Sequence, residues 1–223
     1  MPGSLFPVAR TPMVYYAMDD LTREYVTSFY DRSLHLFGDR PESLRWTQEG
    51  QRARHEAMLD IAGRIQGRKI LDFGCGKGDF YQFLKDKGIE PHYTGFDINE
   101  NLIALARQKF PGTRFEVCDI ERDTISEEFD YIFLCGVFNL KVQGIDEFIQ
   151  VALKKLFRSC RIGLAFNALS AHAPQKDFEL HYTSPEALLG FALEHLSPFV
   201  VMRHDRIPYD FTMFVYRDLN AHP

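Results

Sequence analysis

The chain has 223 residues, of which 45% are hydrophobic and 14% aromatic, so it has the composition of a folded domain with a large core. Its formal net charge of -5 and the lack of any run of lysine and arginine argue against a nucleic-acid partner. The length fits one α/β domain with an appendage.

The four cysteines form no C-x-x-C pair, which disfavours a zinc site, and we predict no metal. The opening residues, MPGSLFPVAR, hold no apolar core of signal-peptide length. No apolar run approaches the ~20 residues that a membrane-spanning helix needs. These features predict a reduced, cytoplasmic protein without a membrane partner.

The N-terminal region is expected to hold a tail and two helices. Residues 1–12 carry three prolines and are predicted to form a loose tail. A helix is predicted over 19–37, because its residues step at helical spacing at Leu21, Tyr25, Ser28 or Phe29, and Arg32. A second helix is predicted over 47–65, with one face formed by Met58, Ile61, Ala62 and Ile65.

From residue 68 onward, strands alternate with helices, which indicates a parallel sheet. Strands are predicted over 68–73, 92–97, 114–118, 130–135, 161–166, 199–204 and 211–217. Helices are predicted over 79–88, 99–110, 143–156 and 184–194.

The last two predicted strands are joined by residues 205–210, a link too short for a parallel crossover, which needs about a dozen residues. The final strand is therefore expected to run antiparallel. The predicted fold is α/β: a doubly wound, seven-stranded, mostly parallel sheet with an antiparallel last strand, plus an N-terminal helical lid.

The segment KILDFGCGKGDF (69–80) runs from the first predicted strand into a glycine-rich turn. In a doubly wound sheet the ligand lies outside the carboxyl ends of the strands. Glycines such as Gly74 and Gly76 let the backbone approach a ligand there, because they have no Cβ. Asp97, at the end of the second strand, can accept hydrogen bonds from both hydroxyls of a ribose. These features fit a dinucleotide and S-adenosylmethionine equally.

Three details favour S-adenosylmethionine. Residue 79 is Asp, where the dinucleotide fingerprint G-x-G-x-x-G/A has a small residue. Asp72 adds a second negative charge, and acids suit a cationic amine and sulfonium better than a diphosphate. The antiparallel last strand is not a feature of the dinucleotide fold. A phosphate-binding loop is excluded, since no G-x-x-x-x-G-K-[ST] motif is present.

Four segments in this order resemble the motifs of the class I S-adenosylmethionine-dependent methyltransferases of the small-molecule type. They are LDFGCGKG (71–78), GFDIN (95–99), VCDIE (117–121) and FDYIFLCGVFNL (129–140). With the terminal hairpin, the resemblance covers about residues 68–217. It implies a tail and helical lid over 1–66 and an S-adenosylmethionine-binding methyltransferase domain over 67–223.

The resemblance also implies cofactor-binding residues. Asp72 stands in the acidic place of the first motif, Asp97 would bind the ribose, and Ile98 would pack on the adenine. Asp119 would accept a hydrogen bond from the adenine amino group and Ile120 would flank the ring. Asp119 as a helix cap, and the two isoleucines as ordinary core residues, remain alternatives.

The other cofactor-binding candidates are Gly74, Cys75, Gly76, Gly136 and Arg54. We interpret Cys75 as a small filler beside the cofactor, since the sequence indicates no neighbouring base that would activate it as a nucleophile. Arg54 could pair with the carboxylate of the methionine moiety, and a solvated arginine is the equal alternative.

The acceptor must reach the methyl group over the same strand ends. Side chains from the loops there could orient it or take a proton. The candidates are Asn139, His172, His181, Tyr182 and His204. Each could instead have a structural role in a cap, a packing contact or a polar turn. Methyl transfer need not use a base, since positioning alone can supply on the order of 7–11 kcal/mol.

The leading hypothesis is methyl transfer from S-adenosylmethionine to O or N of a small polar metabolite. CGVF stands where enzymes that methylate base amino groups carry D/N-P-P-Y/F, which disfavours DNA or RNA as the acceptor. Another enzymatic use of the same donor, by intramolecular cyclisation or by aminopropyl or aminocarboxypropyl transfer, is an alternative. A non-catalytic, cofactor-binding partner subunit is a third possibility. The oligomeric state is not predicted.

Overall fold

The computed structural model describes residues 17–61 and 65–219. Within these ranges the strands form one seven-stranded sheet with the order β3-β2-β1-β4-β5-β7-β6. The strands are β1 (Lys69–Phe73), β2 (His92–Asp97), β3 (Arg114–Val117), β4 (Phe129–Leu134), β5 (Cys160–Leu169), β6 (Val200–Ile207) and β7 (Asp210–Tyr216). The predicted tail over 1–12 and Ala62 lie outside the described residues.

The sheet is parallel except at its seventh strand, as predicted. β1 pairs in parallel with β2 and β4, and β4 pairs in parallel with β5. β7 lies between β5 and β6 and is antiparallel to both. The hairpin is tighter than expected, because β6 continues to Ile207 and only Pro208 and Tyr209 separate it from β7. The prediction ended β6 early because its second half is exposed and polar and shows no hydrophobic alternation.

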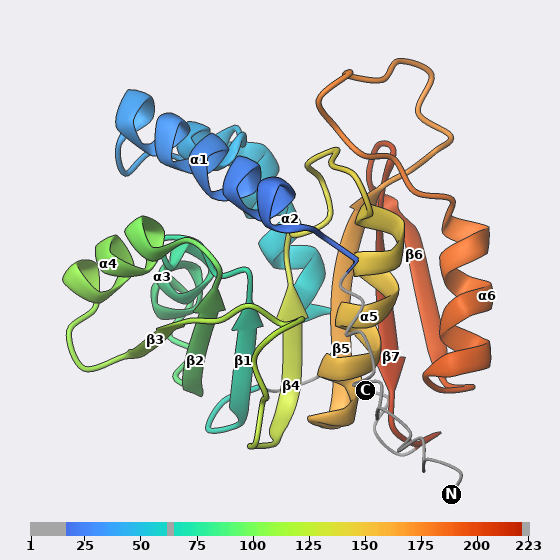
Figure 1. Ribbon diagram of the computed structural model, residues 1–223. Helices are drawn as coiled ribbons and strands as arrows, with labels where there is room; N and C mark the ends of the chain where they lie inside the picture. Colours follow the sequence, from blue (N-terminus) through green and yellow to red (C-terminus); the bar gives the residue numbers. More distant parts are fainter. Residues whose placement is uncertain (1–16, 62–64, 220–223) are drawn as a thin grey trace, which may run out of the picture.

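Helices cover both faces of the sheet (Figure 1). On one face lie α2 (Gln48–Leu59), α3 (Asp79–Asp86) and α4 (Glu100–Lys109), and their buried side chains share one apolar cluster. On the other face α5 (Ile145–Arg158) and α6 (Pro185–His195) contribute to a second cluster. Because helices cover both faces, the central strands are mostly buried. In β4, the last four of its six residues form a continuous buried run.

The lid consists of α1 (Asp20–Phe37) and the short 3₁₀ helix η1 (Pro41–Leu44). Asp19 caps α1 by accepting a hydrogen bond from the Thr22 amide. The helix lies across the end of the sheet where the parallel strands finish (Figure 1). Leu21 and Tyr25, two of the residues whose helical spacing predicted this helix, are 73% and 44% exposed.

The second N-terminal helix is part of the core rather than a cover over it. α2 packs against β5 and β6, and Met58 and Ile61 are fully buried. Thr47 caps its start by accepting a hydrogen bond from the Gly50 amide at 3.1 Å. The division of the chain at residues 66 and 67 stays a prediction. Among the described residues, none of the helices combines the length and apolar character needed to span a membrane.

Candidate active site

The turn between β1 and α3 has three glycines at positive φ, and two of them, Gly74 and Gly76, line the site. Gly74 and Gly76 have φ angles of 74° and 53°, in the left-handed region that disfavours side chains. A Cβ at Gly74 would lie 2.4 Å from Val137 in the loop after β4. The amides of Gly74 and Cys75 both donate to the carbonyl of Phe96 on β2, at 2.7 and 3.0 Å. The turn therefore packs closely against the ends of the two neighbouring strands.

Asp97 completes this turn from the end of β2. Its Oδ2 accepts a hydrogen bond from the Gly76 amide, and its Oδ1 accepts one from the Asn99 amide, each at 2.8 Å. Burial raises the pKa of Asp97, and these backbone donors oppose the rise. The carboxylate is thereby fixed in orientation and lines a cavity over the strand ends.

Two of the acids that the sequence argument relied on do not line this cavity. Asp72 is 2% exposed beneath the turn, where the Tyr93 hydroxyl donates to it. Asp79 is paired with Lys77 and Lys109 and accepts a hydrogen bond from the Gln51 amide group at 2.8 Å. The two lysines therefore compensate the negative charge of Asp79. The sequence analysis expected this acid to face the ligand and did not predict its pairing with lysines.

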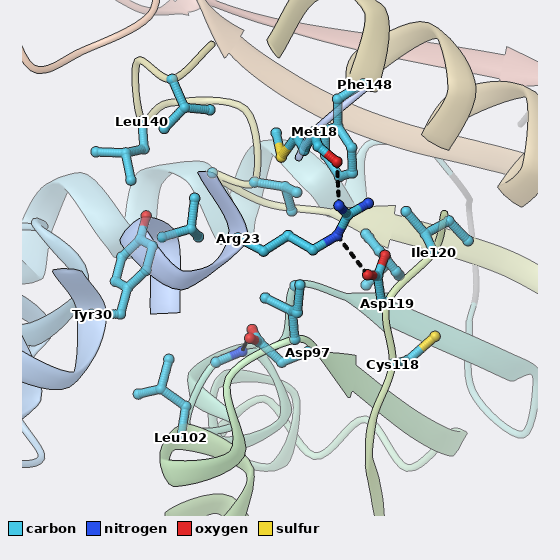
Figure 2. Close-up of a pocket in the computed structure, with 18 of the residues that line it drawn as sticks. Met18, Arg23, Tyr30, Asp97, Leu102, Cys118, Asp119, Ile120, Leu140 and Phe148 are labelled. Atoms are coloured by element: carbon cyan, nitrogen blue, oxygen red, sulfur yellow. Dashed lines mark hydrogen bonds and ion pairs between the residues drawn. The ribbon is translucent and has the colours of Figure 1, made fainter. Parts of the chain in front are cut away.

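The first cavity lies between the strand ends and α1 (Figure 2). Seven predicted cofactor residues line it: Gly74, Gly76, Asp97, Ile98, Asp119, Ile120 and Gly136. Three predicted residues are not among its lining residues: Asp72, Cys75 and Arg54. Cys75 is buried, and its sulfur lies against Gly95, where a Cβ would be 2.9 Å away. Burial raises the pKa of the Cys75 thiol well above its ordinary value, which keeps it protonated.

Arg23 on α1 reaches the far side of the cavity (Figure 2). Its Nε donates to Asp119 Oδ2 at 2.8 Å and its Nη2 to Glu121 Oε2 at 2.7 Å. Its Nη1 donates to the carbonyl of Met18. Glu121 also accepts hydrogen bonds from the Ala17 and Met18 amides, at 2.6 and 3.1 Å. The start of the lid is thus tied to the loop after β3.

Sequence reasoning missed this wall of the cavity. Arg23, Val26 and Tyr30 all line it, and they stand at i, i+3 and i+7 of α1. That spacing places the three residues on one face of the helix, and this pattern could have indicated a cavity wall. The apolar residues on the other side of the helix made the pattern hard to recognise. Burial and the nearby Asp97 raise the pKa of Tyr30 to about 12, so its hydroxyl is neutral at neutral pH.

A second cavity adjoins the first. The two share Tyr30, Leu44, Trp46, Gly136 and Leu140 as lining residues. Its walls come from the lid, from the loop after β4 and from the segment before α6. Asn139, one of the predicted catalytic candidates, lines this cavity and is 9% exposed.

Arg54 lines the second cavity and has a different partner from the one expected. Its Nε donates to Asp210 Oδ2 at 2.8 Å, and its guanidinium lies 4.2 Å from the centre of the Trp46 ring. Asn167 also donates to Asp210, at 3.1 Å, and its Oδ1 accepts from the Gly136 amide at 2.8 Å. This chain of contacts joins α2, the hairpin, β5 and the loop after β4.

The other four catalytic candidates line neither cavity. His172 is exposed, with Nε2 2.6 Å from Glu186 Oε1. His181 Nε2 lies 3.2 Å from Asp146 Oδ1, and the Tyr182 hydroxyl accepts from the Asp177 amide at 3.0 Å. His204 is exposed on β6. Their loops were expected at the rim, but their side chains turn to other contacts.

The strand order, the reversed seventh strand and the glycine turn define a Rossmann-like methyltransferase fold. A family described as "Methyltransferase domain" matches residues 70–163. The putative methyltransferase Rv1506c of Mycobacterium tuberculosis is 30% identical over 152 residues, which cover 66% of this chain and 91% of that protein. The chain belongs to the class I S-adenosylmethionine-dependent methyltransferases.

Two further comparisons are consistent with a methyltransferase. Malonyl-acyl carrier protein O-methyltransferase of Enterobacter lignolyticus is 30% identical over 138 residues, 60% of this chain and 52% of that enzyme, so the match spans about half of its length. The structure of magnesium protoporphyrin IX methyltransferase from Synechocystis, with S-adenosylhomocysteine bound, aligns with a TM-score of 0.63 at 15% identity. The alignment covers 89% of this chain and 99% of the Synechocystis chain, and it shows that the two proteins share a fold.

The residues of the first cavity fit the S-adenosylmethionine on which this class depends. A Cβ at Gly76 would lie 3.1 Å from Leu44, so its absence leaves room between turn and lid. Acidic groups line the cavity at the ends of β2 and β3, where they suit ribose hydroxyls, an amino group and a cation. Among the described residues, no group of three or more His, Cys, Asp or Glu could hold a metal ion.

Proposed function

We propose that this enzyme transfers the methyl group of S-adenosylmethionine to an oxygen or nitrogen of a small polar metabolite. The observation that supports this proposal best is the pair of adjoining cavities that meet at Tyr30, Trp46 and Gly136. The first cavity has the acids and the glycine turn of a donor site. The second adjoins it over the same strand ends, which is the position of an acceptor site.

In the proposed donor site, Asp97 binds the ribose hydroxyls and Ile98 and Ile120 flank the adenine. Asp119 already accepts hydrogen bonds from Arg23 and from the Glu121 amide. Its remaining lone pairs accept a hydrogen bond from the adenine amino group. Gly74, Gly76 and Gly136 allow the backbone to approach the methionine part. When bound, S-adenosylmethionine supplies an electrophilic methyl group on a sulfonium.

The enzyme's own residues hold the acceptor and exclude water. α1 and η1 cover both cavities from above, and Asn139 and Tyr30 offer polar groups beside an acceptor. The relative named for malonyl-acyl carrier protein supports an acyl group as the acceptor, and we propose no nucleic-acid partner.

Product analysis tests this proposal. The full chain is incubated with S-adenosylmethionine and a panel of small hydroxyl, amine and carboxylic acid acceptors. We expect S-adenosylhomocysteine together with a methylated acceptor. Methylthioadenosine as the product would mean that another bond of the donor is broken and would contradict methyl transfer. Binding without turnover under any condition would favour the partner-subunit alternative.

A further inference from the structure

We infer that the acceptor is an amphipathic carboxylic acid, held in the second cavity and methylated on its carboxylate oxygen. This inference rests on the proposed function and names the substrate class of the same site. Four observations support it: an apolar wall, two arginines without acidic side chains in the lining, a pair of polar groups at the junction, and the lack of a base.

The wall of the second cavity is mainly apolar and aromatic. The lid supplies Phe29 and Leu44, and Trp46 follows it. The end of β5 supplies Leu169, and the loops beside it supply Leu140 and Leu180. A wholly hydrophilic metabolite would leave these surfaces without complementary contact, whereas a hydrocarbon or ring is stabilised by their burial. The acceptor therefore has a substantial apolar part.

The charged side chains in this lining are both arginines, Arg45 and Arg54, and no Asp or Glu is among the lining residues. Arg54 is held rigidly by Asp210, and its guanidinium lies against Trp46. Arg45 pairs with Glu179 at 2.8 Å, but its side chain is 41% exposed. Exposed pairs of this kind are weak, so Arg45 can exchange Glu179 for a carboxylate of the ligand. Both arginines are already paired with carboxylates, and the described lining residues offer no further acid to an ammonium acceptor.

Two polar groups can orient a carboxylate where the cavities meet. The Tyr30 hydroxyl stays protonated, because its pKa is raised, and so it acts as a hydrogen-bond donor. Figure 2 shows this hydroxyl on the side of Leu140, away from Asp97. Asn139 lines the second cavity. Its Nδ2 donates hydrogen bonds and is the atom that can contact a carboxylate, whereas its Oδ1 only accepts and cannot.

Among the residues that the structure describes, neither cavity offers a base for an acceptor that must lose a proton. The described lining of the second contains no His, Lys, Cys or carboxylate. In the first, Asp97 accepts two backbone amides, and Asp119 and Glu121 are paired with Arg23. Burial raises the pKa of Cys135 far above neutrality. A carboxylate is already ionised at neutral pH and needs no base.

The transfer balances without any proton movement. A lone pair of the carboxylate oxygen forms a bond to the methyl carbon, while the bond from that carbon to sulfur breaks. The electron pair of the broken bond stays on sulfur, which loses its positive charge. The products are a methyl ester and S-adenosylhomocysteine.

The single tryptophan of the chain gives a direct binding assay, because Trp46 lines both cavities. The full chain, saturated with S-adenosylhomocysteine, is titrated with 3-phenylpropanoate, 3-phenylpropanamide and 3-phenylpropylamine while Trp46 fluorescence is recorded. We expect the carboxylate to bind at least tenfold more tightly than the amide or the amine. Equal or tighter binding of the amine or amide, or no response to any of the three at millimolar concentration, overturns the inference.

Variants with matched controls test the residues. Tyr30→Phe and Arg45→Gln should each weaken 3-phenylpropanoate binding at least fivefold. Tyr25→Phe, on the same helix, and Arg52→Gln, exposed on α2, should leave it unchanged. If the two cavity variants bind as tightly as the controls, the assignment is overturned.

A chemical readout separates this inference from the proposed function. With donor labelled in its methyl group, a methyl ester releases the label as methanol in mild alkali, whereas ethers and methylamines keep it. We expect alkali-labile label on the acids. Label that stays in an ether or amine contradicts the inference but leaves methyl transfer intact. Failure of the protein to bind S-adenosylhomocysteine in calorimetry contradicts the proposed function itself.

Discussion

Asp72 carries a proton in the folded protein at a pH where the unfolded chain has lost it. Burial, with smaller contributions from Asp97 and Asp79, raises the pKa of Asp72 from 3.8 to about 7, although the Tyr93 hydroxyl donates to its carboxylate. Between pH 4 and 7 the folded state therefore binds more protons than the unfolded state. The free energy of unfolding falls as the pH rises through this window, by on the order of 4 kcal/mol for this group.

Asp72→Asn removes this titration while keeping an oxygen that can accept from Tyr93. We expect the free energy of unfolding of the wild type to fall more between pH 5 and pH 8 than that of the variant. Urea unfolding at the two pH values measures both differences. Parallel pH dependences for the two proteins would show that Asp72 does not hold its proton through this range.

Gly136 offers a second prediction at the residue scale. Its φ is 77°, and a Cβ there would lie 2.3 Å from the Trp46 ring. Gly136→Ala should therefore shift Trp46 fluorescence and weaken binding of S-adenosylhomocysteine at least tenfold. Gly112→Ala is the matched control, since Gly112 has a φ of 88° with nothing within 4 Å of an added Cβ. Both variants carry backbone strain of about 1 kcal/mol or more, but the collision is confined to Gly136. Equal donor affinity in the two variants would count against a role for Gly136 at the junction.

At the scale of elements, α1 is held over the strand ends by contacts along its length. Arg23 pairs with Asp119 and Glu121 near its start. In its middle, Asn99 donates to the Thr27 carbonyl at 3.0 Å and also caps α4. The cover over the donor site is therefore attached to the same loops that carry the proposed adenine and ribose residues.

Arg23→Gln should loosen this cover. The side chains of Arg23 and Glu121 are 9% and 3% exposed, and removing one partner of such a buried pair costs about 3 kcal/mol. We expect the α1 amides to exchange hydrogen at least tenfold faster, with little change in the central strands β1 and β4. Arg32→Gln, exposed on the same helix, serves as the control. Unchanged exchange in α1 of Arg23→Gln would mean that these ion pairs do not hold the lid.

At the scale of the whole molecule, local patterns were enough to predict the sheet. The short link before β7 predicted its reversed direction, and the buried run of β4 predicted a strand covered on both faces. The glycine turn and Asp97 were found because they follow directly from strand ends in the sequence.

The parts of the site that were not predicted depend on contacts between segments far apart in the sequence. No local sequence pattern contains these contacts. Arg54 and Asp210 are 156 positions apart, and their pairing explains why Arg54 is not at the donor cavity. Arg23 and Glu121 are 98 positions apart. The second cavity likewise exists only because the lid meets the loops after β4 and β5. Its residues could not be grouped from the sequence, although Asn139 was found singly.

The central claim is that S-adenosylmethionine binds over the ends of β1 and β2, with Asp97 on the ribose. Calorimetric titration of the wild type, Asp97→Ala and the exposed control Asp86→Ala with S-adenosylhomocysteine tests it most directly. Losing a charge-assisted contact of this kind costs about 2–3 kcal/mol, or roughly a 30- to 150-fold rise in Kd. We predict that rise for Asp97→Ala and no change for Asp86→Ala. An unchanged Kd in a folded Asp97→Ala protein would contradict the proposed site.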